Sequence, residues 1–168
     1  MNDTYYELIV KRKMSSTSLL IRFLVVVVTA IAFMLGMLIL NIYGLIVGFF
    51  LAYLDIIIFR NTDTEYEYQF ISGDLDIDII YGKAKRKKLN RYDMRKIEIF
   101  APTNSAKLAS YNNGTVKVLD YSSGYLDRLT YSFIIDTNDG HKTKVIFEPN
   151  EKLINAIKTV AGSKVNMY

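Results

Sequence analysis

The chain has 168 residues, of which 51% are apolar, a formal net charge of +4 and no cysteine. This length fits one ordinary domain, or a membrane segment followed by one small domain, and the uneven spread of the apolar residues favours the second arrangement. Without cysteine the protein has no disulfide, no thiolate nucleophile and no thiolate metal site.

Residues 19–59 form a nearly continuous apolar stretch in which only Arg22 and Asp55 are charged. A membrane-spanning helix needs about 20 apolar residues. The stretch therefore predicts a transmembrane helical hairpin with spans near residues 19–40 and 43–59.

The distribution of positive charge predicts the orientation of this hairpin. Lys and Arg flank its two outer ends, whereas the turn around Asn41 carries neither. Because positive residues stay on the cytoplasmic side, we expect a multi-pass protein of the cell membrane, with an N-terminal segment (residues 1–18) and a domain (residues 60–168) both in the cytoplasm. The flanking residues are Lys11, Arg12, Lys13, Arg22 and Arg60.

Small residues recur along both predicted spans and allow two helix backbones to approach closely. They predict either that the two helices of one hairpin pack together or that two copies form a homodimer through the hairpin. These residues are Ala32 and Gly36 in the first span, and Gly44, Gly48 and Ala52 in the second.

Asp55 follows Ala52 on nearly the same helix face, and an intramembrane carboxylate is a candidate functional site because its burial in lipid is costly. Alternatively, Asp55 lies near enough to the cytoplasmic end for water and the Thr29 hydroxyl to reach it. Folding the hairpin about its turn places Arg22 level with residue 63, so we expect no direct ion pair between Arg22 and Asp55.

After Arg60 the apolar pattern changes to alternation, which is typical of strands with one buried face. It predicts strands over Thr64–Ile71 and Asp74–Tyr81, joined by a two-residue turn at Ser72-Gly73 that puts both apolar sets on one face. Turn residues separate further predicted strands at residues 85–89, 95–100, 115–119, 130–136 and 142–147. The separating turns are Ala101-Pro102, Asn112-Asn113-Gly114, Ser122-Ser123-Gly124 and Asn138-Asp139-Gly140.

The chain closes with Pro149-Asn150-Glu151, a helix start signal, and with Gly162 as a stop. Apolar residues between them recur at helical spacing. Seven antiparallel strands and one terminal helix would bury their apolar faces as a small barrel or sandwich with the helix as a plug.

This order of elements, together with several local stretches, resembles small uncharacterised bacterial membrane proteins that carry a PH-like domain after a two-helix transmembrane hairpin. The resemblance implies an α+β membrane protein with a seven-stranded antiparallel PH-like barrel and a C-terminal helix, and it implies no activity. The stretches that carry it are Glu65-Tyr66-Glu67-Tyr68, Gly73 to Asp78, Gly82 to Lys87, Lys117 to Tyr121 and Glu148 to Ile154.

Five positive residues are concentrated directly after the second predicted strand, and we call them the basic run: Lys83, Lys85, Arg86, Lys87 and Lys88. The first two strands run away from the membrane and back, which returns the basic run to the bilayer surface. There it would meet anionic headgroups, at about 1 kcal/mol per residue.

Two other interpretations of the basic run remain open. It is a solvated strand, or it compensates acidic neighbours, with Lys87 placed beside Asp78. Nucleic acid is a poorer partner, since the surrounding face is acidic. The first hairpin turn, Ser72-Gly73-Asp74, lacks the basic residues that lipid-binding PH domains use there.

No residue pattern predicts catalysis, a metal site or a cofactor. His141 is the only histidine and lies in a predicted turn, and alternating aspartates on a strand are far more often solvated than metal-binding. We therefore expect a non-catalytic binding or scaffolding module for lipid or a protein partner. The alternative is an accessory or regulatory subunit of a membrane transport complex in which Asp55 acts within the bilayer.

Overall fold

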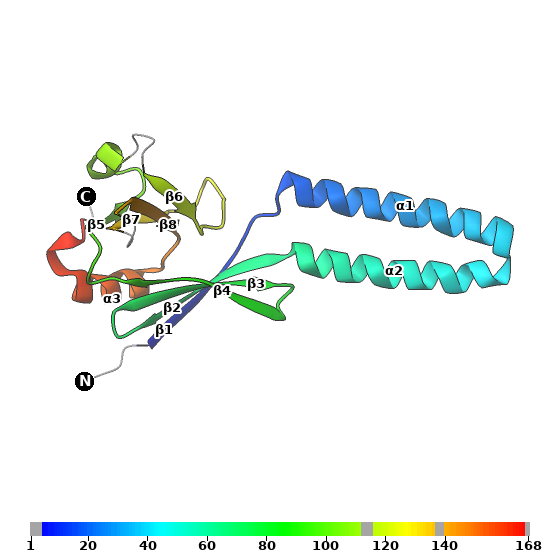
Figure 1. Ribbon diagram of the computed structural model, residues 1–168, viewed down its shortest axis with the longest axis horizontal. Helices are drawn as coiled ribbons and strands as arrows, with labels where there is room; N and C mark the ends of the chain where they lie inside the picture. The colour runs from blue at the N-terminus through cyan, green and yellow to red at the C-terminus, as the bar shows by residue number, and fades with distance from the viewer. Residues whose placement is uncertain (1–4, 112–115, 137–139, 167–168) are drawn as a thin grey trace. The chain divides into compact units, whose positions relative to one another are not determined.

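The computed structural model describes residues 5–111, 116–136 and 140–166 (Figure 1). They form two compact units. The helical unit consists of Lys13–Thr64 with Ile80–Arg86, and the sheet unit consists of the other described residues. Each unit is described by itself below.

The helical unit is an antiparallel helix pair, α1 (Ser16–Leu40) and α2 (Ile42–Thr62), as predicted. Asn41 alone separates the helices and adopts a left-handed φ of 53°, which Asn tolerates better than most residues. With mean hydropathies of 2.9 and 2.3, both helices are long and apolar enough to cross a membrane. They extend beyond the predicted spans because helical hydrogen bonding continues where the apolar residues end.

The first sheet has the strand order β1-β2-β3-β4. Its strands are β1 (Tyr5–Lys11), β2 (Thr64–Ile71), β3 (Asp74–Tyr81) and β4 (Lys85–Asp93). The bounds of β2 and β3 are the predicted ones, and Ser72 and Gly73 adopt φ values of 51° and 97° in the turn between them. The predicted apolar face is also confirmed, since Tyr66, Tyr68, Phe70, Leu75, Ile77 and Ile79 are all buried.

Strand β1 corrects the expectation of a separate N-terminal segment at residues 1–18. It pairs with β2 over its whole length, from Tyr5 opposite Ile71 to Lys11 opposite Glu65. The helical hairpin is thus inserted between two antiparallel neighbours of one sheet. Tyr6, Leu8 and Val10 are half-buried and alternate with exposed residues, but the exposed Tyr5 and Ile9 hide this alternation in the sequence, and the partner strand lies beyond the whole hairpin.

The second sheet has the order β5-β7-β8-β6. Its strands are β5 (Ile99–Pro102), β6 (Lys117–Asp120), β7 (Tyr131–Asp136) and β8 (Lys142–Phe147). The 3-10 helix η1 (Ala106–Tyr111) follows β5. The predicted turn Asn112-Asn113-Gly114 and the first two residues of the predicted turn Asn138-Asp139-Gly140 lie outside the described residues.

Two four-stranded sheets therefore replace the expected seven-stranded antiparallel barrel. β6 pairs with β8 in parallel, which the long connection from β6 to β7 permits. β5 begins later than predicted because Asp93 Oδ1 accepts from the Arg95 backbone N–H at 3.1 Å and holds a turn there. Pro102 ends β5 and is tolerated because β5 is an edge strand.

Aromatic rings join the two sheets in the core of the sheet unit. Tyr68 and Phe147 meet edge to face with ring centroids 5.6 Å apart, and Tyr92 and Phe133 do so at 5.2 Å. The buried Tyr68 hydroxyl donates to the Tyr121 carbonyl at 2.6 Å. Strands from both sheets thus share one core.

The predicted C-terminal helix is confirmed as α3 (Glu151–Ala161). Asn150 Oδ1 accepts from the Leu153 N–H at 2.9 Å and caps its start, and Gly162, with φ 58°, ends it. The short helix η2 (Gly162–Lys164) follows. The apolar face of α3 is buried, so the helix completes the core as its spacing predicted.

Candidate functional site

The turn between β3 and β4 begins the basic run and packs against the end of α2. Gly82 and Lys83 both adopt left-handed φ values, 55° and 57°. The Gly82 N–H donates to the Asp63 carbonyl at 2.8 Å. A Cβ on Gly82 would lie only 2.6 Å from the Arg60 carbonyl oxygen, so only glycine fits at this position.

All five side chains of the basic run are exposed. Lys88 forms an ion pair with Asp76, with 2.8 Å between Nζ and Oδ1. In the described part of the chain, no ion pair involves Lys83, Lys85 or Lys87. Part of the run therefore compensates acidic residues, and part carries positive charge into the surroundings.

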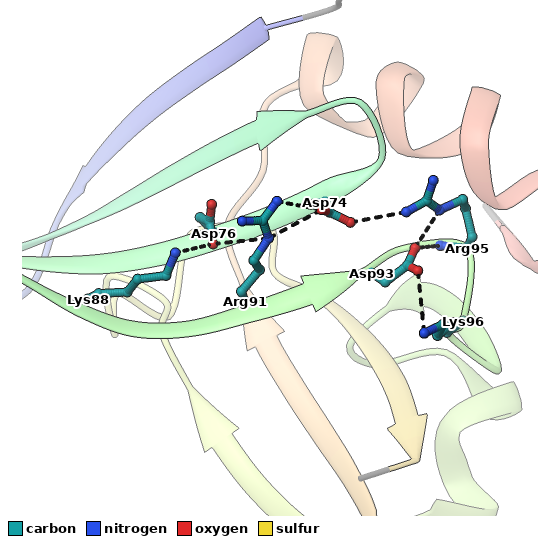
Figure 2. A network of polar contacts seen from close by, with 7 residues as sticks. All are labelled: Asp74, Asp76, Lys88, Arg91, Asp93, Arg95 and Lys96. Carbon is teal, nitrogen blue, oxygen red and sulfur yellow. Dashed lines mark hydrogen bonds and ion pairs between the residues drawn. The ribbon is translucent and has the colours of Figure 1, made fainter. Parts of the chain in front are cut away.

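The compensation is part of a longer network on β3, β4 and the turn after β4 (Figure 2). Arg91 contacts Asp74 at 2.6 Å, and Arg95 Nε contacts Asp93 at 2.7 Å. The hydrogen bond from Arg95 lowers the pKa of Asp93, and the hydrogen bond to Asp74 raises the pKa of Arg91. Lys96 completes the set next to Asp93.

This network corrects the predicted pairing of Lys87 with Asp78. Lys88 pairs with Asp76 instead, and the buried Asp78 Oδ1 has no hydrogen-bond partner among the described residues. Arg91 and Arg95 were not predicted as members of the site. Their spacing from the aspartates of β3 was a usable signal, but it required the length of β4, which is nine residues.

The small residues of the helix pair divide into two groups. Gly36 and Gly44 bring the backbones together, since a Cβ on Gly44 would lie 2.5 Å from the Gly36 carbonyl group. The ring of Phe33 covers Gly48 so closely that a Cβ there would lie 2.2 Å from it. Ala32 is half-buried, whereas Ala52 is exposed and takes no part in this close approach.

The two charged residues of the hairpin lie apart, as expected. Asp55 accepts a hydrogen bond from the Thr29 hydroxyl on the facing helix at 3.1 Å. Arg22 instead donates to the Thr62 hydroxyl at 2.7 Å and to the Phe59 carbonyl at 2.8 Å. Asp55 also borders an apolar hollow of about 360 Å³, lined by Val26, Ala30, Phe33, Phe49 and Ala52 among others.

Within the described ranges, no group of three or more His, Cys, Asp or Glu side chains is arranged to hold a metal ion. His141 is exposed in the connection that leads into β8. The features that the described residues do present are paired charges, exposed lysines and apolar helix surfaces.

Residues 2–167 match the family model described as Bacterial PH-like domain (DUF6106). The match takes in the helix pair as well as both sheets, so the inserted hairpin is a feature that the family model spans. No curated protein and no solved structure matches the chain.

Proposed function

This chain belongs to the bacterial PH-like domain family (DUF6106), and from that premise we propose that it is a non-catalytic, membrane-anchored binding or scaffolding module. α1 and α2 cross the cell membrane, and both termini and the sheet unit lie in the cytoplasm. The lengths of the helices support this proposal. At about 1.5 Å per residue, 25 and 21 residues are sufficient for a hydrocarbon core of about 30 Å.

The observation that carries the proposal is the contact between the β3–β4 turn and the end of α2. Gly82 is bonded to Asp63 directly after the last residues of α2. If α2 spans the bilayer, this turn lies at the headgroups, and Lys83 and Lys85 with it. Their charge would orient the module on an anionic leaflet, at about 1 kcal/mol per residue.

Topology can be tested by thiol labelling, because the natural chain has no cysteine. Tyr43→Cys marks the hairpin turn, and Lys158→Cys marks the exposed face of α3. In intact bacterial cells a membrane-impermeant maleimide should label only Tyr43→Cys, and Lys158→Cys should react after permeabilisation. Labelling of Lys158→Cys from outside would contradict the proposed orientation.

The role of the basic run has to be tested in the full chain, because a fragment limited to residues 61–168 would lack β1, the partner of β2. An Ala84→Cys variant carrying a fluorophore would be placed in nanodiscs that contain lipids with headgroup quenchers. We expect stronger quenching when the nanodiscs contain anionic lipid. Replacing Lys85, Arg86, Lys87 and Lys88 by Gln should remove that difference, and equal quenching in neutral and anionic nanodiscs would contradict the proposal.

The hollow beside Asp55 favours a second candidate function, an accessory or regulatory subunit of a membrane transport complex. A carboxylate at the border of an apolar hollow could receive a polar group from a partner helix. Asp55→Asn keeps the size of the side chain and the bond to Thr29. Loss of co-purifying membrane proteins in that variant would support the subunit function, and an unchanged set would leave only the anchor.

A further inference from the structure

A second hollow of about 360 Å³ lies where the end of α2 meets the β3–β4 turn, entirely within the helical unit. Its lining combines three cations, one carboxylate and two large apolar side chains. These residues are Arg22, Arg60, Lys83, Asp63, Ile56 and Phe59. The cations outnumber the carboxylate, so the hollow favours an anion.

Contacts with α2 hold the Arg22 guanidinium in place and leave several of its N–H donors unused. Its Nε bonds the Thr62 hydroxyl, one terminal nitrogen bonds the Phe59 carbonyl, and its guanidinium lies 5.3 Å from the centroid of the Phe59 ring. A guanidinium carries five N–H groups, and these two bonds use two of them. A fixed guanidinium with free donors suits a phosphate, which accepts several hydrogen bonds at once.

The β3–β4 turn, which contributes Gly82 and Lys83 to the lining, is also fixed. The bond from Gly82 to Asp63 and the close approach of Gly82 to Arg60 hold the turn that carries Lys83. The backbone of Lys83 is therefore held in a fixed position next to Arg60. The cations are already close together before a ligand binds, and this lowers the entropic cost of binding.

The apolar part of the lining identifies the kind of anion. Ile56 and Phe59 belong to the apolar surface of α2, and a small soluble anion would gain nothing from them. A phospholipid fits both parts, because its phosphate can meet the cations while an acyl chain lies along α2. We propose that this hollow binds one anionic phospholipid, with Arg22, Arg60 and Lys83 around the phosphate. This inference rests on the proposed membrane anchoring.

Native mass spectrometry of the full-length protein in detergent can test this site. The probes are phosphatidylglycerol, phosphatidylcholine and inorganic phosphate. We expect one bound phosphatidylglycerol, held at least about tenfold more tightly than phosphatidylcholine, and no competition by inorganic phosphate. Loss of one charge-assisted contact should weaken phosphatidylglycerol binding about tenfold.

Four variants make the measurement specific. Arg60→Gln removes an exposed cation from the hollow, and Lys83→Asn removes another while tolerating the left-handed φ of that position. Both should weaken binding without changing the helical content. Lys117→Gln, in β6 of the sheet unit, should leave binding unchanged. Lys87→Gln should weaken binding less than Lys83→Asn does.

Several results would overturn the inference. Equal binding of the two lipids would show that the cations do not select an anion, and competition by inorganic phosphate would show a site for a soluble ligand. If Lys87→Gln weakens binding as much as Lys83→Asn, the attraction is diffuse and there is no discrete site. The membrane anchoring would survive these results, since the thiol-labelling experiment tests it separately.

Discussion

The helical unit and the sheet unit are both rich in apolar side chains, but the helical unit exposes most of them and the sheet unit buries most of them. In the most apolar stretches of α1 and α2, only 0% and 11% of the residues are buried within the protein. In the sheet unit, Phe147 is fully buried among three other aromatic rings. The two helices approach each other most closely at Gly36, Gly44 and Gly48, whereas aromatic rings pack the two sheets together.

If α1 and α2 span the bilayer as proposed, this difference follows from the different solvents around the two units. The hydrophobic effect rewards burial only in water, so it can hold the sheets together but not two helices surrounded by lipid. In lipid, close backbone packing has to replace it. The stabilities of the two units should therefore respond to different substitutions, and the predictions below separate them.

The largest expected effect follows from β1, which ties the two units together in sequence. Deleting residues 1–11 exposes the β2 edge and removes the half-buried Tyr6, Leu8 and Val10 from the sheet. We expect the sheet unit to lose cooperative unfolding, a loss comparable with the net stability of a small domain, about 5 kcal/mol or more. Urea denaturation followed by near-UV circular dichroism measures this.

The matched variant keeps β1 and removes the hairpin by replacing residues 13–63 with a short Gly/Asn turn. Lys11 and Glu65 are paired neighbours, and such partners lie only about 5 Å apart. This variant should be soluble and should unfold cooperatively. If the variant without β1 unfolds cooperatively and the variant without the hairpin aggregates, the sheet depends on the helices and not on β1.

The same substitution in the two units should differ strongly in cost. Phe147→Ala leaves a cavity in a fully buried aromatic cluster and should lower the free energy of unfolding of the sheet unit by about 4 kcal/mol. Phe49→Ala affects a side chain that is 76% exposed on α2, and it should leave that free energy unchanged. A similar loss in both variants would mean that the units unfold together.

Two glycines allow the same contrast within the hairpin. Gly44→Ala forces a Cβ against the Gly36 backbone, whereas a Cβ on Gly36 would lie at an ordinary 3.5 Å from Gly44 Cα. Gly44→Ala should destabilise the helix pair by about 2 kcal/mol, and Gly36→Ala should not. Distances between spin labels at Leu24→Cys and Tyr53→Cys would report this, and identical distance distributions in both variants would contradict it.

The smallest effect concerns the Tyr68 hydroxyl, which donates to the Tyr121 carbonyl and accepts from the Glu148 N–H. Tyr68→Phe leaves these buried backbone groups without a partner and should cost about 1.5 kcal/mol in the free energy of unfolding of the sheet unit. Tyr131→Phe, whose hydroxyl makes no hydrogen bond among the described residues, serves as the control. A loss below the error of urea denaturation would contradict this role.

The same hydroxyl makes stability depend on alkaline pH. Burial raises the pKa of Tyr68 above its ordinary value, and burial also raises that of Tyr92. Below about pH 10 both hydroxyls are neutral in the folded and unfolded states, so their contribution is complete. Above that pH the unfolded state loses protons first, and stability falls as pH rises. Tyr68→Phe should make that fall shallower, which urea denaturation at several alkaline pH values would show.

Much of the candidate site was open to prediction from local sequence. The apolar spans, the separation of Arg22 from Asp55 and the return of the basic run to the end of α2 all followed from chain connectivity and strand length. The partners within the site did not follow. The pairing of Lys88 with Asp76, and of Arg22 with Thr62 and Phe59, depends on side-chain contacts between residues that are distant in sequence or on different elements.

Local sequence was enough to predict the helical hairpin, the β2–β3 turn and the start and stop of α3, because hydropathy, glycine and capping residues act within a few positions of the chain. Three features became evident only in the folded chain: β1 joins β2 across the inserted hairpin, β6 lies parallel to β8, and two sheets form where one barrel was expected. These pairings are non-local. An alternating strand pattern indicates which face is buried but not which strand lies beside it.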